Sequence, residues 1–265
     1  MSVNVLVTGA NGQLAKTIQK LFANNKDNVH FTFTTKKELD ITNPKQVKNH
    51  IANKNYDYCI NCAAYTNVEQ AEKTPEIAYK VNAEGVKNLA EACKKTSAIL
   101  IHISTDYVFD GEKETPYTED DIPNPINEYG KSKLLGEHYV QDILEHYFII
   151  RTSWLYSKEF GHNFYKTILE KAQTEKELHI TDAQIGCPTN TVNLSKFIYA
   201  LILEQSKDIG IKHFCDRKAM TWFDFAQQIL KENGLENKIK LVKAKKYPTF
   251  ARRPKNSSLS NSKLE

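Results

Sequence analysis

Tyr129 and Lys133 lie in the segment Tyr129-Gly-Lys-Ser-Lys133, a spacing that places both side chains on one face of a helix. An ammonium group beside a phenol favours the phenolate. A free tyrosine, with a pKa of about 10, needs such help to transfer protons near neutral pH. Most pairs with this spacing are only surface contacts. The pair therefore indicates proton-transfer chemistry only in combination with other signals.

A glycine-rich turn near the N-terminus is the second signal. We expect Val3–Val7 to form a buried strand that leads into residues 8–15 and then into an amphipathic helix. Gly9 allows a tight turn, Gly12 lets the backbone approach a pyrophosphate, and the unpaired amides at the helix start bind the anion. Ala15 is small enough for close packing of helix on strand. The arrangement predicts a dinucleotide site with cofactor contacts from Gly9, Asn11, Gly12, Gln13 and Leu14.

Strand-like and helical segments alternate along the chain, which is typical of parallel strands joined by helical crossovers. We expect helices to begin at Asn43-Pro44, at Thr74-Pro75 and at Glu128, the second of them ending near Lys95. The polar loop at 110–127 is expected to border a site at the carboxyl ends of the strands. After the first strand, the expected strands are His30–Thr34, Tyr58–Asn61, Ile99–Ser104 and Tyr147–Arg151.

The end of the second expected strand indicates which nicotinamide cofactor is bound. An acidic side chain there pairs with the ribose hydroxyls of NAD and repels the additional phosphate of NADP. The sequence Phe33-Thr-Thr-Lys-Lys37 has no acid and instead offers hydroxyls, that of Thr35 among them, and two cations. The pattern favours NADPH, with NADH as the alternative.

The composition fits one domain with a smaller lobe, since 265 residues with 40% hydrophobic content can form a good core. No segment has the apolar length of a membrane span and the N-terminus lacks a signal-peptide pattern, so we expect a cytoplasmic protein. The net charge is only +4 and lysines alternate with acids, which argues against nucleic acid binding. The basic residues between Lys238 and Lys255 are either a solvated face or a site for a diphosphate.

The five cysteines are odd in number and scattered, which suits a reducing compartment better than a disulfide framework. Cys59 and Cys62 form a CxxC pair. Because strand alternation sends residues three apart to opposite faces, we expect buried thiols rather than a metal or redox pair.

Several ordered motifs carry a family resemblance that covers nearly the whole chain. They are Gly9 to Ala15, Asn61 to Thr66, Asn82 to Gly85, Ser104 to Phe109, Tyr129 to Lys133, Arg151 to Tyr156, Gly161 to Phe164 and Arg253 to Ser257. With these motifs the chain resembles the extended short-chain dehydrogenase/reductases, and among them the dTDP-4-dehydrorhamnose reductase family.

The resemblance implies three catalytic residues. Thr105 would hold the substrate carbonyl, and Tyr129 would protonate the developing alkoxide. Lys133 would bond the nicotinamide ribose and lower the pKa of Tyr129. Ser104 is either a helper or a residue that bonds the backbone at the strand end. Asn82, in mid-helix, either faces solvent or supports the backbone and water near Lys133.

The resemblance also implies ligand contacts. Asp40 and Ile41 would lie beside the adenine, and three residues after the fourth strand would line the pyrophosphate and nicotinamide channel, namely Ala63, Ala64 and Tyr65. Trp154 either packs on a deoxysugar or is simply buried, and Arg253 either meets the diphosphate or is a surface cation. The residues implied to contact the sugar nucleotide are Asp106, Tyr107, Trp154, Asn163 and Arg253.

The activity implied is reduction by NADPH of the C4 ketone of dTDP-6-deoxy-L-lyxo-4-hexulose to dTDP-L-rhamnose. Related 4,6-dehydratases place Asp and Glu directly after the catalytic Thr, whereas here Asp106 is followed by Tyr107. The missing carboxylate argues against elimination chemistry. The alternatives are a reductase or epimerase of another nucleotide-4-ketosugar, and a non-catalytic protein like the regulatory subunit of methionine adenosyltransferase.

The expected fold is an α/β, Rossmann-like doubly wound parallel sheet with a smaller C-terminal lobe. We assign residues 1–155 and 187–209 to an NAD(P)-binding domain, and residues 156–186 and 210–265 to a sugar-nucleotide-binding lobe. The chain stops at Lys263-Leu-Glu265, where relatives usually continue through another helix, so the last element of this lobe is expected to be absent. The resemblance implies that some relatives dimerise through a metal held by acidic residues, but Pro188–Asn193 has no acid, so we predict no metal dimer and expect a monomer or weak homodimer.

Overall fold

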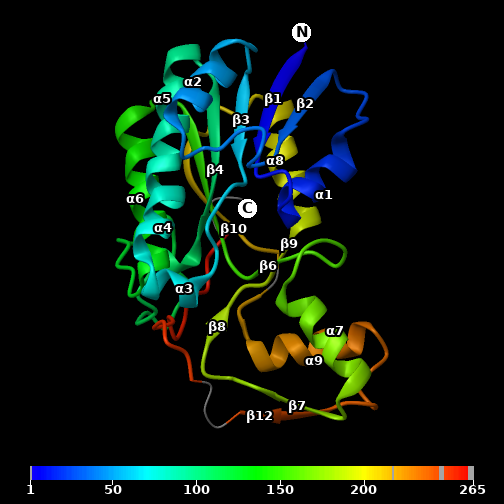
Figure 1. Cartoon of the computed structure of the whole chain (residues 1–265). Coiled ribbons are helices and arrows are strands. Elements are labelled where there is room, and N and C mark those ends of the chain that lie inside the picture. Colours follow the sequence, from blue (N-terminus) through cyan, green and yellow to red (C-terminus); the bar gives the residue numbers. More distant parts are fainter. Residues whose placement is uncertain (1, 217, 245–247, 262–265) are drawn as a thin grey trace.

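A six-stranded parallel sheet forms the centre of the molecule (Figure 1). The computed structural model describes residues 2–216, 218–244 and 248–261. The sheet confirms the predicted Rossmann-like fold, although the strand before Ala63 is the third in the chain and not the fourth. In spatial order the strands are β10 (Gly210–Phe214), β5 (Tyr147–Thr152), β4 (Ile99–Thr105), β3 (Tyr58–Asn61), β1 (Val3–Thr8) and β2 (Val29–Thr34).

Helices cover both faces of this sheet because their apolar sides pack on the buried strands (Figure 1). One face is covered by α1 (Gln13–Phe22) and α8 (Thr191–Leu203). The opposite face is covered by α2 (Pro44–Ala52), α5 (Gly85–Thr96) and α6 (Glu128–Ile143). The expected helix starts are confirmed for α2 and α6, where the side chains of Asn43 and Asn127 accept hydrogen bonds from the first turn.

The long helix expected from Thr74-Pro75 contains a π-helical turn. It consists of α4 (Pro75–Tyr79), the π-helical segment η1 (Lys80–Glu84) and α5. Gly85 and Gly136 allow close approach here, since a Cβ on Gly136 would lie 2.1 Å from the main-chain oxygen of Asn82. Such a turn often marks a functional position, and Asn82 lies within it.

A smaller lobe lies below the carboxyl ends of the strands (Figure 1). Its core joins α7 (Phe164–Thr174) and α9 (Trp222–Glu232) to the parallel pair β7 (Glu177–Ile180) and β12 (Lys240–Lys243). Two short pairs connect it to the sheet: β8 (Ile185–Gly186) with β11 (Met220–Thr221), and β6 (Leu155–Tyr156) with β9 (Thr189–Asn190).

The division between the lobes differs from the one predicted at residue 210. Gly210–Phe214 pairs with β5 as an edge strand of the central sheet, so this segment does not belong to the smaller lobe. Residues 248–261 also return to the larger part of the molecule, since Leu259 forms a bridge with Tyr117 and packs in a buried cluster with Phe109. The expectation for Lys263–Glu265 lies outside the described residues, as do Lys245 and Lys246 of the basic segment.

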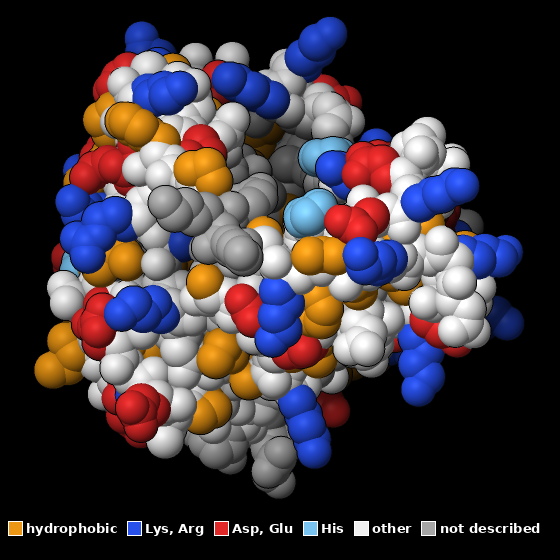
Figure 2. Space-filling view, turned by 90° about the horizontal axis from the view of Figure 1, so that it is seen from below, with side chains coloured by type: hydrophobic (Ala, Val, Ile, Leu, Met, Phe, Trp, Pro, Cys, Tyr) orange, Lys and Arg blue, Asp and Glu red, His pale blue; other side chains and the backbone are white. Residues whose placement is uncertain are grey.

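None of the helices within the described residues is long and apolar enough to cross a membrane. Figure 2 shows the lower end of the molecule, where lysine and arginine side chains are mixed with acidic ones over the same face.

Candidate active site

Three connected cavities lie where the strands end and the smaller lobe begins. The central cavity, of about 540 Å³, is lined from both lobes, by Thr105 and Tyr129 on one side and by Trp154 and Trp222 on the other. The glycine-loop cavity, of about 320 Å³, shares Asn11, Gly12, Cys62 and Ala64 with it. The outer cavity, of about 690 Å³, shares Thr66, His162, Asn163, Phe164 and Trp222 with it.

Two hydroxyl groups meet at the inner end of the central cavity. Thr105 is the last residue of β4, and its Oγ1 accepts the main-chain N–H of Tyr107 at 3.2 Å. Tyr129, from the first turn of α6, is hydrogen-bonded to Thr105, yet burial outweighs this bond and raises the pKa of the phenol. Without a cofactor, desolvation therefore dominates the pKa of Tyr129, and the lowering expected from a ribose-bound Lys133 stays a prediction.

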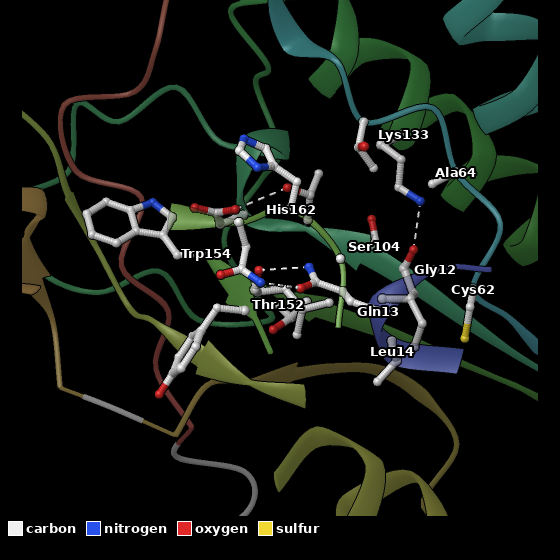
Figure 3. A pocket seen from close by; sticks show the side chains of 18 of the residues that line it. Gly12, Gln13, Leu14, Cys62, Ala64, Ser104, Lys133, Thr152, Trp154 and His162 are labelled. Atoms are coloured by element: carbon white, nitrogen blue, oxygen red, sulfur yellow. Dashed lines mark hydrogen bonds between the residues drawn. The ribbon is translucent and has the colours of Figure 1, made fainter. Parts of the chain in front are cut away.

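Lys133 reaches the same cavity from the next turn of α6 (Figure 3). Its Nζ donates to the main-chain oxygen of Ile103 at 2.7 Å and lies 3.3 Å from Nε2 of His102. Burial lowers the pKa of Lys133 to about 8. Lys133 and Tyr129 thus line one wall, as their spacing predicts.

Asn82 is fully buried and does not face solvent. Its amide accepts the N–H of Tyr65 at 2.8 Å and donates to the carbonyl of Tyr65 at 3.0 Å and to Ser132 Oγ at 3.0 Å. The expected support of the backbone is thus visible, and it fixes the segment after β3 against the helix that carries Lys133.

Asp106 is a buried carboxylate that lines the central cavity beside Thr105. It accepts hydrogen bonds from the hydroxyls of Thr105 at 3.1 Å, Ser153 at 2.8 Å and Ser257 at 2.5 Å. Burial raises its pKa to about 6, although these hydroxyls act in the opposite direction. The residue is therefore held in place by its neighbour Thr105 and by two distant segments of the chain.

Ser104 also lines the central cavity, and its hydroxyl does not bond the backbone. It donates to the carboxylate of Glu137, which also receives Nε and Nη2 of Arg151, the latter at 2.7 Å. All three residues are buried. The buried ion pair between Glu137 and Arg151, with the hydroxyl of Ser104, fixes the middle of α6 against β4 and β5.

The glycine-loop cavity is lined by many of the residues that the sequence predicts to contact the cofactor. A Cβ on Gly9 would lie 2.7 Å from the main-chain nitrogen of Ala63, and its φ of +69° also requires glycine. The cavity is lined by the predicted residues Gly9, Asn11, Gly12, Asp40, Ile41, Ala63, Ala64 and Tyr65, together with Lys36.

The end of β2 differs from the prediction in one respect. Thr35 is not among the residues that line the cavity, and its N–H and its hydroxyl both donate to the carboxylate of Glu38 at 2.8 Å. The expectation that no acid stands at this strand end is therefore wrong, since Glu38 folds back to it. Lys36, in contrast, lines the cavity as expected for a cation at this point.

Gln13 and Asn163 have structural partners that the sequence did not indicate. Gln13 Nε2 donates to the carbonyl of Leu155, and its Oε1 accepts from Ser157 N–H and from Asn163 Nδ2, both at 3.1 Å. Asn163 Oδ1 accepts the N–H of Lys166 and so begins α7. Both residues line the central cavity together with Leu14, but their side-chain amides join the two lobes.

Arg253 lines the outer cavity and is half-buried. Its Nη2 lies 2.8 Å from Glu69 Oε1, and its Nη1 lies 3.5 Å from the hydroxyl of Tyr107. Tyr107 itself is buried edge-on against Tyr129 and lines none of the three cavities. Arg253 thus lines a cavity as expected, whereas the ring of Tyr107 is buried and lines none of the three.

Trp154 is neither free in the cavity nor simply buried. Its ring stacks on Trp222 with centroids 3.4 Å apart, and it packs on Gly186, where a Cβ would lie 2.3 Å from the indole. Its φ of +46° is in the left-handed region, a strained conformation for a bulky residue. Figure 3 shows this indole across the cavity from Lys133.

Several lining residues were not identified from the sequence as site residues, including His162, Phe164 and Trp222. Gly161 and His162 stand within a quoted motif, but nothing in their types or spacing indicates a function. Trp222 comes from α9 and reaches the cavity only because the lobes pack together, so no local signal could have found it.

The five cysteines are free thiols, and of the CxxC pair, in which we expected two buried thiols, Cys59 is buried and Cys62 is only half-buried. Cys59 is buried in the core, and Cys62 lines the central cavity. Within the described residues, no group of three or more His, Cys, Asp or Glu side chains could hold a metal ion.

Comparison with known proteins adds a family to this geometry. The family model described as "RmlD substrate binding domain" matches residues 3–265. The dTDP-4-dehydrorhamnose reductase of Aggregatibacter actinomycetemcomitans is 39% identical over 98% of this chain and 92% of its own length. The crystal structure of the Bacillus anthracis enzyme of that name in complex with NADP is 39% identical, with a TM-score of 0.94 over 100% of this chain and 92% of that one. The corresponding Clostridium acetobutylicum structure is 42% identical, with a TM-score of 0.92 over 99% and 91%. The chain therefore belongs to the dTDP-4-dehydrorhamnose reductase family.

Proposed function

We propose that this protein reduces the C4 ketone of dTDP-6-deoxy-L-lyxo-4-hexulose, also named dTDP-4-dehydro-6-deoxy-L-mannose, with NADPH to give dTDP-L-rhamnose. The observation that carries this proposal is the continuous row of three cavities, with the hydroxyls of Thr105 and Tyr129 in the middle one. A dinucleotide and a sugar nucleotide entering from opposite ends would meet beside these two hydroxyls.

The residues around the glycine-loop cavity fit the cofactor. The small residues Gly9, Gly12 and Ala63 allow close approach of a pyrophosphate, and the start of α1 offers unpaired amides to it. Lys36 supplies a positive charge where the additional phosphate of NADPH would lie. The Bacillus anthracis relative was crystallised with NADP, which supports this choice. When bound, NADPH supplies the hydride for the reduction.

The outer cavity suits the nucleotide part of the substrate. Arg253 and Lys171 are cations along its wall, and a guanidinium fork matches the oxygens of a diphosphate. Glu69 holds Arg253 in position. The sugar would then lie in the central cavity, between the indole of Trp154 and the pair formed by Thr105 and Tyr129.

The chemistry follows from the positions of the protein's own groups. Thr105, oriented by the N–H of Tyr107, would turn its hydroxyl hydrogen from Asp106 to the ketone oxygen. Tyr129 is held neutral by burial, which suits a general acid that must give its proton to the alkoxide. Lys133 would then stabilise the phenolate that remains.

The product would serve the synthesis of surface polysaccharide, in line with the name of a Bacillus subtilis relative, "Spore coat polysaccharide biosynthesis protein SpsK", which is 37% identical. The free thiols support a reducing compartment, so we place the reaction in the cytoplasm. We propose a monomer or weak homodimer without a bridging metal, and no nucleic acid partner.

The first test follows NADPH loss by absorbance with enzymatically prepared dTDP-6-deoxy-L-lyxo-4-hexulose. Tyr129→Phe should cut turnover by about a hundredfold or more and leave NADPH binding intact. The matched control is Tyr139→Phe, on the same helix, where the hydroxyl bonds only Glu84 at the surface. If the wild-type protein binds NADPH without consuming it, the substrate is another ketosugar or the protein is a binding subunit.

A further inference from the structure

His102, in β4, contacts Lys133 from within the core. Its Nε2 lies 3.3 Å from Lys133 Nζ, and its Nδ1 lies 3.1 Å from Asn61 Nδ2. Both ring nitrogens therefore face groups that ordinarily donate hydrogen bonds. Burial, with Lys133 nearby, lowers the pKa of His102 well below its usual value, so the ring is neutral. A neutral imidazole has one donor and one acceptor nitrogen and cannot accept at both.

Asn61 determines which of the two nitrogens accepts. Its Oδ1 receives the main-chain N–H of Ala63 at 3.2 Å and the hydroxyl of Thr8 at 2.7 Å. A main-chain N–H can only donate, so a flipped amide would set the Asn61 amino group against it. Asn61 Nδ2 therefore donates to Nδ1 of His102. The hydrogen of the imidazole is then on Nε2, which faces Lys133.

Lys133 can accept this hydrogen only as a neutral amine. In that form Nζ accepts from His102 Nε2 and still donates to the carbonyl of Ile103. As an ammonium it has only donors, so the hydrogen of His102 must move to Nδ1, where it opposes the amino group of Asn61. We propose that His102 is a positioning residue whose tautomer is coupled to the charge of Lys133.

The other ionisable groups around Lys133 do not remove its coupling to the tautomer of His102. Glu137, on the same helix, favours the ammonium, but its carboxylate is already paired with Arg151. Cys62, after β3, stays a thiol because burial raises its pKa to about 12. Tyr129, one turn away, stays neutral for the same reason. The charged and neutral forms of Lys133 therefore exchange near pH 8, within reach of ordinary conditions.

The coupling connects the catalytic lysine to the cofactor loop. Charging Lys133 breaks the bond between His102 and Asn61, and Asn61 holds the N–H of Ala63, which packs on Gly9. The coupling is a property of the protein alone, and only its relevance to reduction rests on the proposed function. In that reaction the ammonium is the form that can donate to ribose hydroxyls and to the phenolate of Tyr129.

Histidine tautomers can be read from ¹⁵N NMR spectra of ¹⁵N-histidine-labelled protein without ligand between pH 6 and 10. The His102 signal is assigned by its loss in His102→Gln. We expect it to change from Nδ1–H at low pH to Nε2–H at high pH, with a midpoint near pH 8 and no imidazolium. A single tautomer throughout this range would overturn the proposal.

Two variants separate coupling from packing. Lys133→Met removes the titrating amine, so His102 should keep the Nε2–H tautomer at every pH. Asn61→Asp offers an acceptor to Nδ1–H, so the midpoint should rise by about one unit or more. The matched control is His138→Gln, an exposed position on α6, which should leave the His102 signal unchanged. A His102 titration that persists in Lys133→Met would contradict the coupling.

A separate arm uses NADPH without substrate. Calorimetry at pH 8.5 in two buffers of different ionisation enthalpy should show that NADPH binding takes up a proton in the wild-type protein and none in Lys133→Met. Binding without proton uptake would contradict the inferred role of the charged form. Absence of NADPH binding, together with the expected tautomer change, would instead reject the proposed function and leave the coupling intact.

Discussion

Asn163 Nδ2 lies 3.1 Å from Gln13 Oε1, so a side chain that begins the small-lobe helix α7 is hydrogen-bonded to one from the glycine loop, 150 positions earlier. Gln13 also bonds the carbonyl of Leu155 and the N–H of Ser157. One amide side chain that borders the central cavity therefore contributes three hydrogen bonds to the contact between the lobes.

Gln13→Ala should loosen this connection. We expect the free energy of unfolding to fall by about 1–2 kcal/mol, and the affinity for the sugar nucleotide to fall several-fold because half of its site shifts. Urea unfolding and substrate titration measure the two effects. Gln19→Ala is the matched control, since Gln19 is exposed on the same helix. Identical unfolding curves for the two variants would show that the contact contributes nothing.

Thr105→Val should lower kcat by about a hundredfold, because it removes the hydroxyl that would bond the ketone oxygen. It also removes the acceptor for the N–H of Tyr107. Thr105→Ser keeps both roles and should retain most of the activity. Steady-state rates of NADPH consumption for the two variants test this prediction, and equal losses in both would assign Thr105 a packing role instead.

Lys36→Ala should weaken the use of NADPH without affecting NADH. The lysine is exposed and lines the glycine-loop cavity, so we expect kcat/KM for NADPH to fall about fivefold at low salt, and less at high salt. Lys37→Ala is the control, because Lys37 is equally exposed but does not line the cavity. A parallel decrease with NADH would mean that Lys36 does not distinguish the two cofactors.

Asp106→Asn should change how stability depends on pH. The folded-state pKa of about 6 lies above the ordinary value of 3.8, so the folded protein binds this proton more tightly than the unfolded chain. The contribution of Asp106 to stability is complete below the ordinary value and is lost as pH rises through about 6. By pH 7 the loss amounts to about 3 kcal/mol.

Denaturant unfolding from pH 4 to 7.5 measures this dependence. The stability of Asp106→Asn relative to wild type should increase over that range. Asp121→Asn is the control of opposite sign, because hydrogen bonds from Lys113 and Thr118 lower the pKa of Asp121, so its contribution is present above the ordinary value and lost in acid. A pH-independent difference for Asp106→Asn would show that its pKa is not raised.

The sequence was sufficient for features that depend on local pattern. Alternating apolar strands and capped helices predicted the parallel sheet, and the strand ends then brought Thr105, Tyr129 and Lys133 together. The sequence did not predict contacts in which a side chain folds back onto an earlier residue or reaches from one lobe to the other. Glu38 returns to Thr35 from three positions later, and nothing in the pattern of β2 indicates this.

Contacts between segments far apart in the chain were also not predicted from the sequence. Gly210–Phe214 was not among the expected strands, and only its pairing with β5 places it in the central sheet. Trp222 stacks on Trp154 because two lobes pack, which no local periodicity encodes. The residue type of Trp154 suggested that its ring could pack on a sugar, but only the structure shows that the ring stacks on Trp222.

The bond from Ser257 to Asp106 has a consequence for the order of synthesis. Thr105, Tyr129 and Lys133 leave the ribosome long before Ser257, which is 151 positions after Asp106. Until that serine emerges, the buried carboxylate next to the reacting hydroxyls lacks one of its three partners, and Arg253 is missing from the outer cavity. A growing chain therefore carries an incomplete site until the segment with Arg253 and Ser257 has been synthesised.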